Sequence, residues 1–173
     1  LGQLKRGKST LLNALVGEPV LPVGIVPVTS AVTILRHAPE RAARVLFADG
    51  GSTAIDLADL ATYVAEEHNP ENAKGVAAAE VRVPSPLLAS GMCLVDTPGI
   101  GSVFAGNTAV TKQFLPHVDA ALVVIGADPP ISGEELAMIE TVARETREIL
   151  VVLDKADRLA AAELAEAHAF ASR

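Results

Sequence analysis

The chain has 173 residues, half of them hydrophobic, and a formal net charge of −7. This length is enough for one domain with a buried core. The acidic balance argues against a nucleic-acid-binding surface, and the single cysteine, Cys93, excludes a disulfide framework and fits a reducing cytoplasm. No apolar run is long enough to span a bilayer. We therefore expect one domain over residues 1–173.

The chain opens on Gly2–Ser9, which fits the pattern G-x-x-x-x-G-K-[ST] of a phosphate-binding loop, or P-loop. Its glycines let successive backbone N–H groups point at phosphate oxygens. Lys8 offers a cation to the β and γ phosphates, and Ser9 offers a hydroxyl to Mg²⁺. A helix predicted over Thr10–Val16 adds its positive N-terminal end. The predicted phosphate contacts are Gly2, Gln3, Leu4, Lys5, Arg6, Gly7, Lys8, Ser9 and Thr10.

Apolar patterning along the rest of the chain predicts alternating strands and helices. Two strand-like runs, 32–37 and 44–48, predict a hairpin at one edge of the sheet. Leucines at helical spacing predict a helix over 56–67, and Ser132 with Glu135 forms a capping box that opens another helix. Further strands are expected at 79–83, 92–95, 120–125 and 149–153, with helices near 110–116 and at the Ala-rich C-terminus.

This alternation predicts an α/β fold of the P-loop NTPase type. We expect three α/β/α layers around a mostly parallel sheet with an antiparallel edge hairpin. A P-loop follows a strand, yet only Leu1 precedes Gly2. We therefore expect the N-terminal strand and the C-terminal elements to be truncated.

Two further motifs fit a metal and nucleotide site. Asp96-x-x-Gly99 follows an apolar strand, where a P-loop nucleotidase places an Asp that holds Mg²⁺. Gly99 has no side chain, so its N–H can approach the γ-phosphate closely. Thr29 ends a Pro/Gly-rich loop and matches the switch threonine that closes on Mg²⁺ and the γ-phosphate. Ser30 and Thr33 are nearby alternatives to Thr29. The predicted metal ligands are Ser9, Thr29 and Asp96.

The segment Asp154-Lys155-Ala156-Asp157 resembles the N/T-K-x-D motif by which GTPases read guanine. Asp157 can accept hydrogen bonds from the ring N–H and the exocyclic amine of guanine, and adenine lacks that pair of donors. Hydrogen bonds to a charged group contribute about 1.5–3 kcal/mol each, which is enough to select GTP over ATP. The predicted guanine contacts are Asp154, Lys155 and Asp157.

At this point the chain resembles the bacterial dynamin-like proteins. Gly2–Leu15 looks like their P-loop, Leu21–Thr29 like their first switch, and Pro84–Leu88 with Leu94–Ser102 like the run into their second switch. The resemblance implies a dynamin-type GTPase domain that uses Mg²⁺. It also implies a homodimer across the nucleotide face, a helical stalk and membrane contacts through regions outside this chain.

The chain departs from related GTPases at three positions. Eukaryotic dynamins carry a catalytic Gln where this chain has Leu4, and Gln3 is one residue too early. Ras-like enzymes carry a water-orienting Gln where this chain has Ile100. Asp154 replaces an Asn or Thr that can donate a hydrogen bond to guanine. We therefore expect slow hydrolysis without assembly. We assign a charge-compensating role to Lys5, with Arg6 as the alternative and solvent-facing loop cations as the simpler interpretation. The predicted catalytic set is Lys8, Ser9, Thr29, Lys5 and Gly99.

Three classes of function fit these motifs. The first is a dynamin-like GTPase that couples GTP hydrolysis and dimerisation to membrane remodelling, in the cytoplasm or peripherally at the inner face of the membrane. The second is a GTPase of the Era or tRNA-modification type, acting on RNA or ribosomes. The third is a scaffold that binds GTP without hydrolysing it. The flanking regions separate the first two classes, and phosphate release separates the third.

Overall fold

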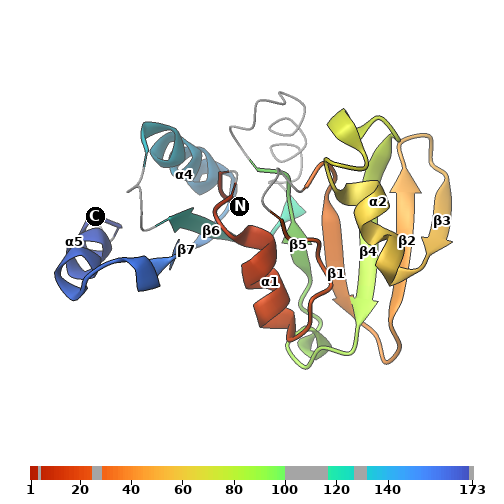
Figure 1. Cartoon of the computed structure of the whole chain (residues 1–173), viewed down its shortest axis with the longest axis horizontal. Coiled ribbons are helices and arrows are strands. Elements are labelled where there is room, and N and C mark those ends of the chain that lie inside the picture. The colour runs from red at the N-terminus through yellow and green to blue at the C-terminus, as the bar shows by residue number, and fades with distance from the viewer. Residues whose placement is uncertain (4, 25–28, 100–116, 127–131, 172–173) are drawn as a thin grey trace.

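The computed structural model describes residues 1–3, 5–24, 29–99, 117–126 and 132–171. Both strands and helices occur along this part of the chain, as the apolar patterning predicts, but the strands at 33–37, 42–47 and 52–55 follow one another without a helix between them (Figure 1). Leu4, Pro27, Val28, Ile100 and the helix expected near 110–116 lie outside the described residues. The elements are α1 (Lys8–Val16), β1 (Thr33–His37), β2 (Ala42–Phe47), β3 (Ser52–Ile55), η1 (Leu57–Asp59), α2 (Leu60–Val64), η2 (Pro70–Asn72), β4 (Val76–Val83), η3 (Leu88–Ser90), β5 (Leu94–Asp96), β6 (Ala120–Gly126), α4 (Gly133–Glu145), β7 (Glu148–Asp154), η5 (Ala156–Arg158) and α5 (Ala161–Ala171).

The larger sheet is mixed, and the expectation of a mostly parallel sheet is wrong. Its five strands lie in the order β3-β2-β4-β1-β5. Only β1 and β4 pair in parallel, whereas β1–β5, β2–β4 and β2–β3 are antiparallel. A second sheet consists of β6 and β7, which pair in parallel. A parallel pair needs a long crossover connection, and α4 supplies it between β6 and β7.

The predicted hairpin is also wrong in its partners. The strands at 33–37 and 42–47 do not pair with each other, because β4 lies between them. The edge hairpin joins β2 to β3 instead, through a turn at Asp49–Gly51. In that turn Asp49 Oδ1 accepts a hydrogen bond from the Gly51 N–H at 2.8 Å. Local pattern missed β3 because this strand is short, largely exposed and polar.

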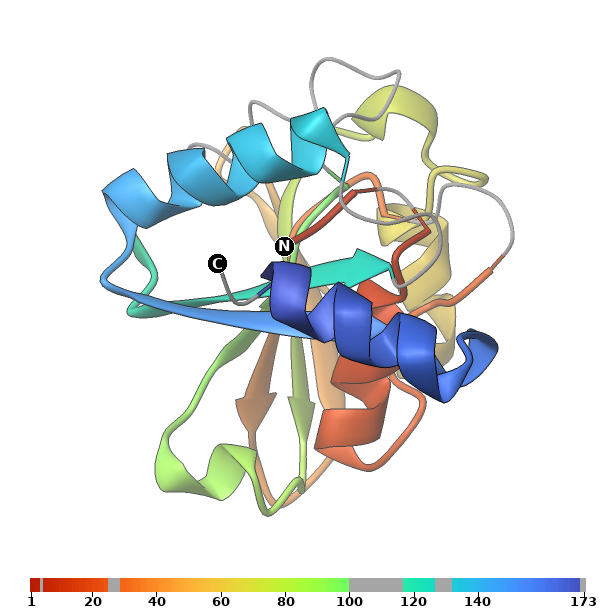
Figure 2. The same cartoon turned by 90° about the vertical axis from the view of Figure 1, so that its left-hand side faces the viewer.

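Buried apolar side chains form two separate hydrophobic cores. In the larger core, α1 and α2 pack on the sheet, with Leu12 and Leu60 against Leu35 and Val81. In the smaller core, α4 packs on β6. Figures 1 and 2 show α4 and α1 on opposite sides of β6, so the P-loop lies between two helical layers. No helix in the described ranges is long and apolar enough to cross a membrane.

The predicted helix over 56–67 is shorter than its leucine spacing suggests. Residues 57–59 form a 3₁₀ turn, and α2 ends at Val64. Ala65 is extended and forms an isolated antiparallel bridge with Thr29. The helix therefore ends where the chain forms a long-range pairing with Thr29.

Candidate nucleotide site

The P-loop connects a strand-like start to the first turn of α1. Leu1 lies along β6, where its nitrogen donates to the Leu122 carbonyl at 2.7 Å and its carbonyl accepts from the Val124 N–H at 2.8 Å. Gly7 is the N-cap of α1 and has φ +80°. A Cβ at Gly7 would overlap the Asp154 carboxylate. The loop therefore runs from a residue that pairs with β6 into the first turn of α1.

Lys8 lies inside this loop. Its Nζ donates to the Gln3 carbonyl at 3.0 Å. Burial lowers the pKa of Lys8, and the nearby Asp96 carboxylate opposes that shift. An ammonium group that has lost much of its hydration gains from an anionic partner, so this position suits a phosphate group.

Three side chains from distant segments meet at Asp96. The Ser9 Oγ donates to Asp96 Oδ2 at 2.7 Å, and the Thr29 Oγ1 donates to the same oxygen at 3.4 Å. Asp96 Oδ1 is buried and has no hydrogen-bond partner among the residues that the structure describes. Burial raises the pKa of Asp96, against the opposing effects of the Ser9 hydrogen bond and of Lys8.

This oxygen cluster fits a small, hard divalent cation. Mg²⁺ prefers carboxylate and hydroxyl oxygens together with phosphates. Asp96 Oδ1, which no other described residue hydrogen-bonds, is an oxygen of that kind. Among the residues described, no group of three His, Cys, Asp or Glu side chains can hold a metal. A cation here would therefore depend on Ser9, Thr29, Asp96 and the bound phosphates.

The two alternatives to Thr29 have other surroundings. Ser30 is buried and donates from both its backbone N–H and its Oγ to the Val64 carbonyl, at 2.7 Å and 3.2 Å. Thr33 is fully buried in β1, and its hydroxyl has no hydrogen-bond partner within the described ranges. Of the three hydroxyls, the one on Thr29 reaches Asp96. Gly99 follows β5 and is buried.

The predicted guanine-reading segment contacts the P-loop. Asp154 ends β7, and its Oδ1 accepts from the Lys155 N–H at 2.8 Å. Lys155 has φ +60°, and its Nζ donates to the Lys5 carbonyl at 2.9 Å. Asp157 is exposed in η5. The segment predicted to read the base and the loop predicted to hold the phosphates therefore share direct contacts.

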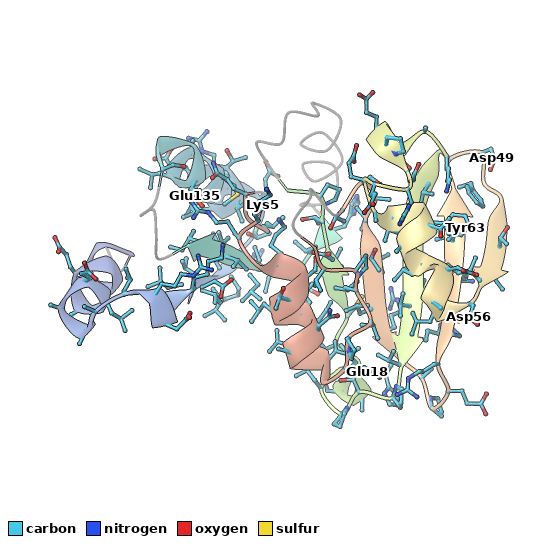
Figure 3. The ribbon with its side chains drawn as sticks, in the orientation of Figure 1. Lys5, Glu18, Asp49, Asp56, Tyr63 and Glu135 are labelled. Carbon is cyan, nitrogen blue, oxygen red and sulfur yellow. The ribbon has the colours of Figure 1, made fainter. Side chains whose placement is uncertain are left out.

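The two loop cations have different environments. Lys5 is exposed and has φ +61°, so its side chain faces solvent while its backbone is held by Lys155. Arg6 is buried and forms an ion pair with Glu135 of α4. The interpretation of Arg6 as a solvent-facing cation is therefore wrong. Figure 3 labels Lys5 near the start of the chain and Glu135 on α4.

Sequence reasoning missed the role of Glu135 at this site. The capping box with Ser132 is present as predicted, but the contact with Arg6 joins residues that are 129 positions apart. The available signal was an acidic capping-box residue at the start of the helix that follows β6 in the sequence. It gave no reason to select Arg6 as the partner.

Comparison with known proteins places this geometry in a family. The sequence profile of the dynamin family matches residues 1–156. An uncharacterized protein of Caldicellulosiruptor sp. is 39% identical over 170 residues, which are 98% of this chain and 42% of that protein. Dynamin-like protein 2 of Campylobacter jejuni is 34% identical over 165 residues, which are 95% of this chain and 26% of that protein. The chain thus spans less than half the length of these relatives.

Solved structures show the same likeness. A chain of an oligomerised bacterial dynamin pair, described as sensing and tethering membranes at long range, matches with a TM-score of 0.76 and 28% identity. That match covers 99% of this chain and 27% of the other. Era of Aquifex aeolicus, bound to GDP and aluminium fluoride, matches with a TM-score of 0.55 and 18% identity, over 98% of this chain and 44% of Era. At that identity the likeness to Era shows the fold alone.

Proposed function

The chain belongs to the dynamin family, and on that premise we propose that it binds GTP with Mg²⁺ and hydrolyses GTP to GDP and phosphate. The observation that carries the proposal is the meeting of Ser9, Thr29 and Asp96, beside Lys8, from three separate segments. Within the described part of the chain, Asp96 Oδ1 is a buried carboxylate oxygen without a hydrogen-bond partner, which a structural turn alone would not require but a metal ligand would.

Each group has a distinct part in this proposal. The P-loop N–H groups and Lys8 bind the phosphates, and Lys8 exchanges its contact with the Gln3 carbonyl for a phosphate oxygen. Ser9, Thr29 and Asp96 hold Mg²⁺, which neutralises charge on the β and γ phosphates. The Gly99 N–H orients the γ-phosphate for in-line attack by water.

The base is read at the other end of the site. Asp157 accepts hydrogen bonds from guanine, and its exposure leaves it accessible to the base. The Lys155 stem packs along the base while its Nζ stays on the Lys5 carbonyl. The Asp154 carboxylate is turned toward the loop and the Lys155 N–H, so its main part is to join base recognition to phosphate binding.

We further propose that residues 1–173 act as one nucleotide-binding domain that dimerises across its nucleotide face. Other parts of the full-length protein would bring it to a membrane surface, peripherally from the cytoplasm. The described oligomerised dynamin pair supports this reading by likeness. An RNA-acting enzyme of the Era type is less well supported, because the match to Era is one of fold alone.

Nucleotide binding and phosphate release on the full-length protein test this function. We expect a fluorescent GDP or GTP analogue to bind. GTP should displace this analogue and ATP should not. Chelation of Mg²⁺ should weaken the GTP complex. Lys8→Ala should abolish binding, because it removes the phosphate cation. Displacement by ATP would refute guanine selectivity. Binding without phosphate release at any protein concentration would identify a non-hydrolysing scaffold.

A further inference from the structure

Arg6 of the P-loop and Glu135 of α4 form a buried ion pair with two close contacts. The Arg6 Nη2 donates to Glu135 Oε2 at 2.9 Å, and the Arg6 Nε lies 2.8 Å from Oε1 without hydrogen-bond alignment. The Arg6 side chain is 10% exposed and that of Glu135 is 0% exposed. Two charges removed from water need close mutual contact to remain ionised together.

The same carboxylate also closes the first turn of α4. Glu135 Oε2 accepts from the Ser132 N–H at 3.0 Å, and the Ser132 Oγ accepts from the Glu135 N–H at 3.1 Å. The Ser132 Oγ also accepts from the Gln3 Nε2 at 3.3 Å. Two side chains of the P-loop, Gln3 and Arg6, are therefore tied to one helix start.

The end of β6 also packs against the Arg6 guanidinium. A Cβ at Gly126 would overlap the Arg6 Nη1. Gly126 is the last residue of β6, and Ser132 is the N-cap of α4. The strand end and the helix start thus enclose Arg6 from two sides, next to the residues proposed to bind phosphate.

A buried ion pair adds little net stability, because the cost of desolvating both charges offsets their attraction. Its stronger effect is to favour one arrangement of the segments that it joins. Here the joined segments are the loop that precedes Lys8 and the helix that follows β6.

We propose that Glu135 and Ser132 are positioning residues for the nucleotide. Through Arg6 and Gln3 they hold the P-loop in the conformation that accepts phosphate, and so they couple nucleotide affinity to the position of α4. This inference rests on the proposed function. It also implies that Arg6 is not a catalytic cation, because its guanidinium is paired with Glu135.

A mutant cycle on the full-length protein tests the coupling. Glu135→Gln keeps a side chain that suits the capping box and removes the charge that holds Arg6. Arg6→Met keeps most of the buried stem. We expect each variant to raise the Kd for a fluorescent GDP analogue by about tenfold, the usual size of coupling between sites. The double variant should be no weaker than either single one. KM for GTP should rise with little change in kcat.

Controls separate positioning from simple loss of stability. Arg41→Met breaks the exposed Arg41–Glu18 pair, which lies 2.8 Å apart elsewhere, and should leave Kd unchanged. Thermal unfolding without nucleotide reports the stability of every variant. If Arg6→Met does not fold, the double variant, which leaves no buried unpaired charge, decides the matter together with Glu135→Gln.

The outcomes are distinct. If wild-type protein binds no nucleotide, the proposed function fails. If wild type binds and the folded variants bind equally well, the positioning role is overturned. If Glu135→Gln raises kcat while Arg6→Met abolishes it, Arg6 is a released catalytic cation and the positioning role is wrong.

Discussion

At the residue scale, Asp96 is a buried carboxyl group whose ionised form is disfavoured by the loss of hydration. Burial raises the pKa of its carboxyl in the folded protein above the unfolded value of ~3.9. Between these two pKa values the folded state holds a proton that the unfolded state has lost. The stability of the nucleotide-free protein therefore decreases as pH rises through that window. The same rise in pH ionises the carboxylate and favours cation binding.

Asp96→Asn should therefore stabilise the nucleotide-free protein and impair its function. Asparagine can still accept from Ser9 and Thr29, but it has no buried charge. We expect a melting temperature at neutral pH about 2–4 °C higher, a typical response to 1 kcal/mol in a domain of this size, with loss of the Mg²⁺ dependence of nucleotide binding. Thermal unfolding of variant and wild type across pH measures the difference, which should grow as pH rises.

The exposed Asp59 supplies a matched control, since Asp59→Asn changes the same functional group outside the site. It should alter neither the melting temperature nor the effect of Mg²⁺. An Asp96→Asn protein that is less stable than wild type at neutral pH would contradict the electrostatic account of Asp96.

At the element scale, the segment at the end of α2 contacts Thr29, the threonine proposed to bind the metal ion. Ala65 pairs with Thr29, and the Val64 carbonyl accepts both hydrogen bonds from Ser30. Thr29 therefore has two contacts: its backbone pairs with Ala65, in the segment between β3 and β4, and its hydroxyl donates to Asp96. This arrangement predicts that α2 affects the γ-phosphate end of the site and leaves the diphosphate end unchanged.

Ser30→Ala tests this separation. It removes one buried hydrogen bond, which is worth about 0.5–1.5 kcal/mol, and loosens Thr29. We expect kcat for GTP to fall by up to about tenfold, with an unchanged Kd for GDP, because GDP has no γ-phosphate for Thr29 to approach. Single-turnover hydrolysis and GDP titration measure the two quantities. Ser90→Ala, which removes an exposed hydroxyl bonded to the Leu87 carbonyl, is the control. Equal losses in both quantities would refute the separation.

Elements and motifs differed in how far the sequence predicted them. Ser9 and Asp96 were predictable because phosphate and metal chemistry require particular residue types just after strands, and the structure brings them together. The strand order was not predictable, because β4 inserts between β1 and β2 through pairings that leave no local pattern. The Arg6–Glu135 contact was hidden for the same reason, since both residues had simpler local explanations.

At the scale of the whole molecule, Lys5 is the loop cation that remains available to a partner. Its side chain is exposed, while Lys155 holds its backbone in place. Arg6 is committed to Glu135. If the nucleotide faces of two copies meet, Lys5 lies where a cation can offset the charge that develops on the transferring phosphate.

Lys5→Ala should therefore impair only the assembled enzyme. We expect wild-type turnover per molecule to rise with protein concentration, and the variant to lose most of that rise while keeping the turnover of dilute protein and its GDP affinity. Elsewhere, arginine fingers supply about 10³–10⁵ in rate, and a solvated lysine should supply less. Lys74→Ala, a change at a lysine that contacts Tyr63 and Thr62 far from the loop, should preserve the rise. A Lys5→Ala protein whose turnover still increases with concentration as in wild type would show that another group compensates the charge.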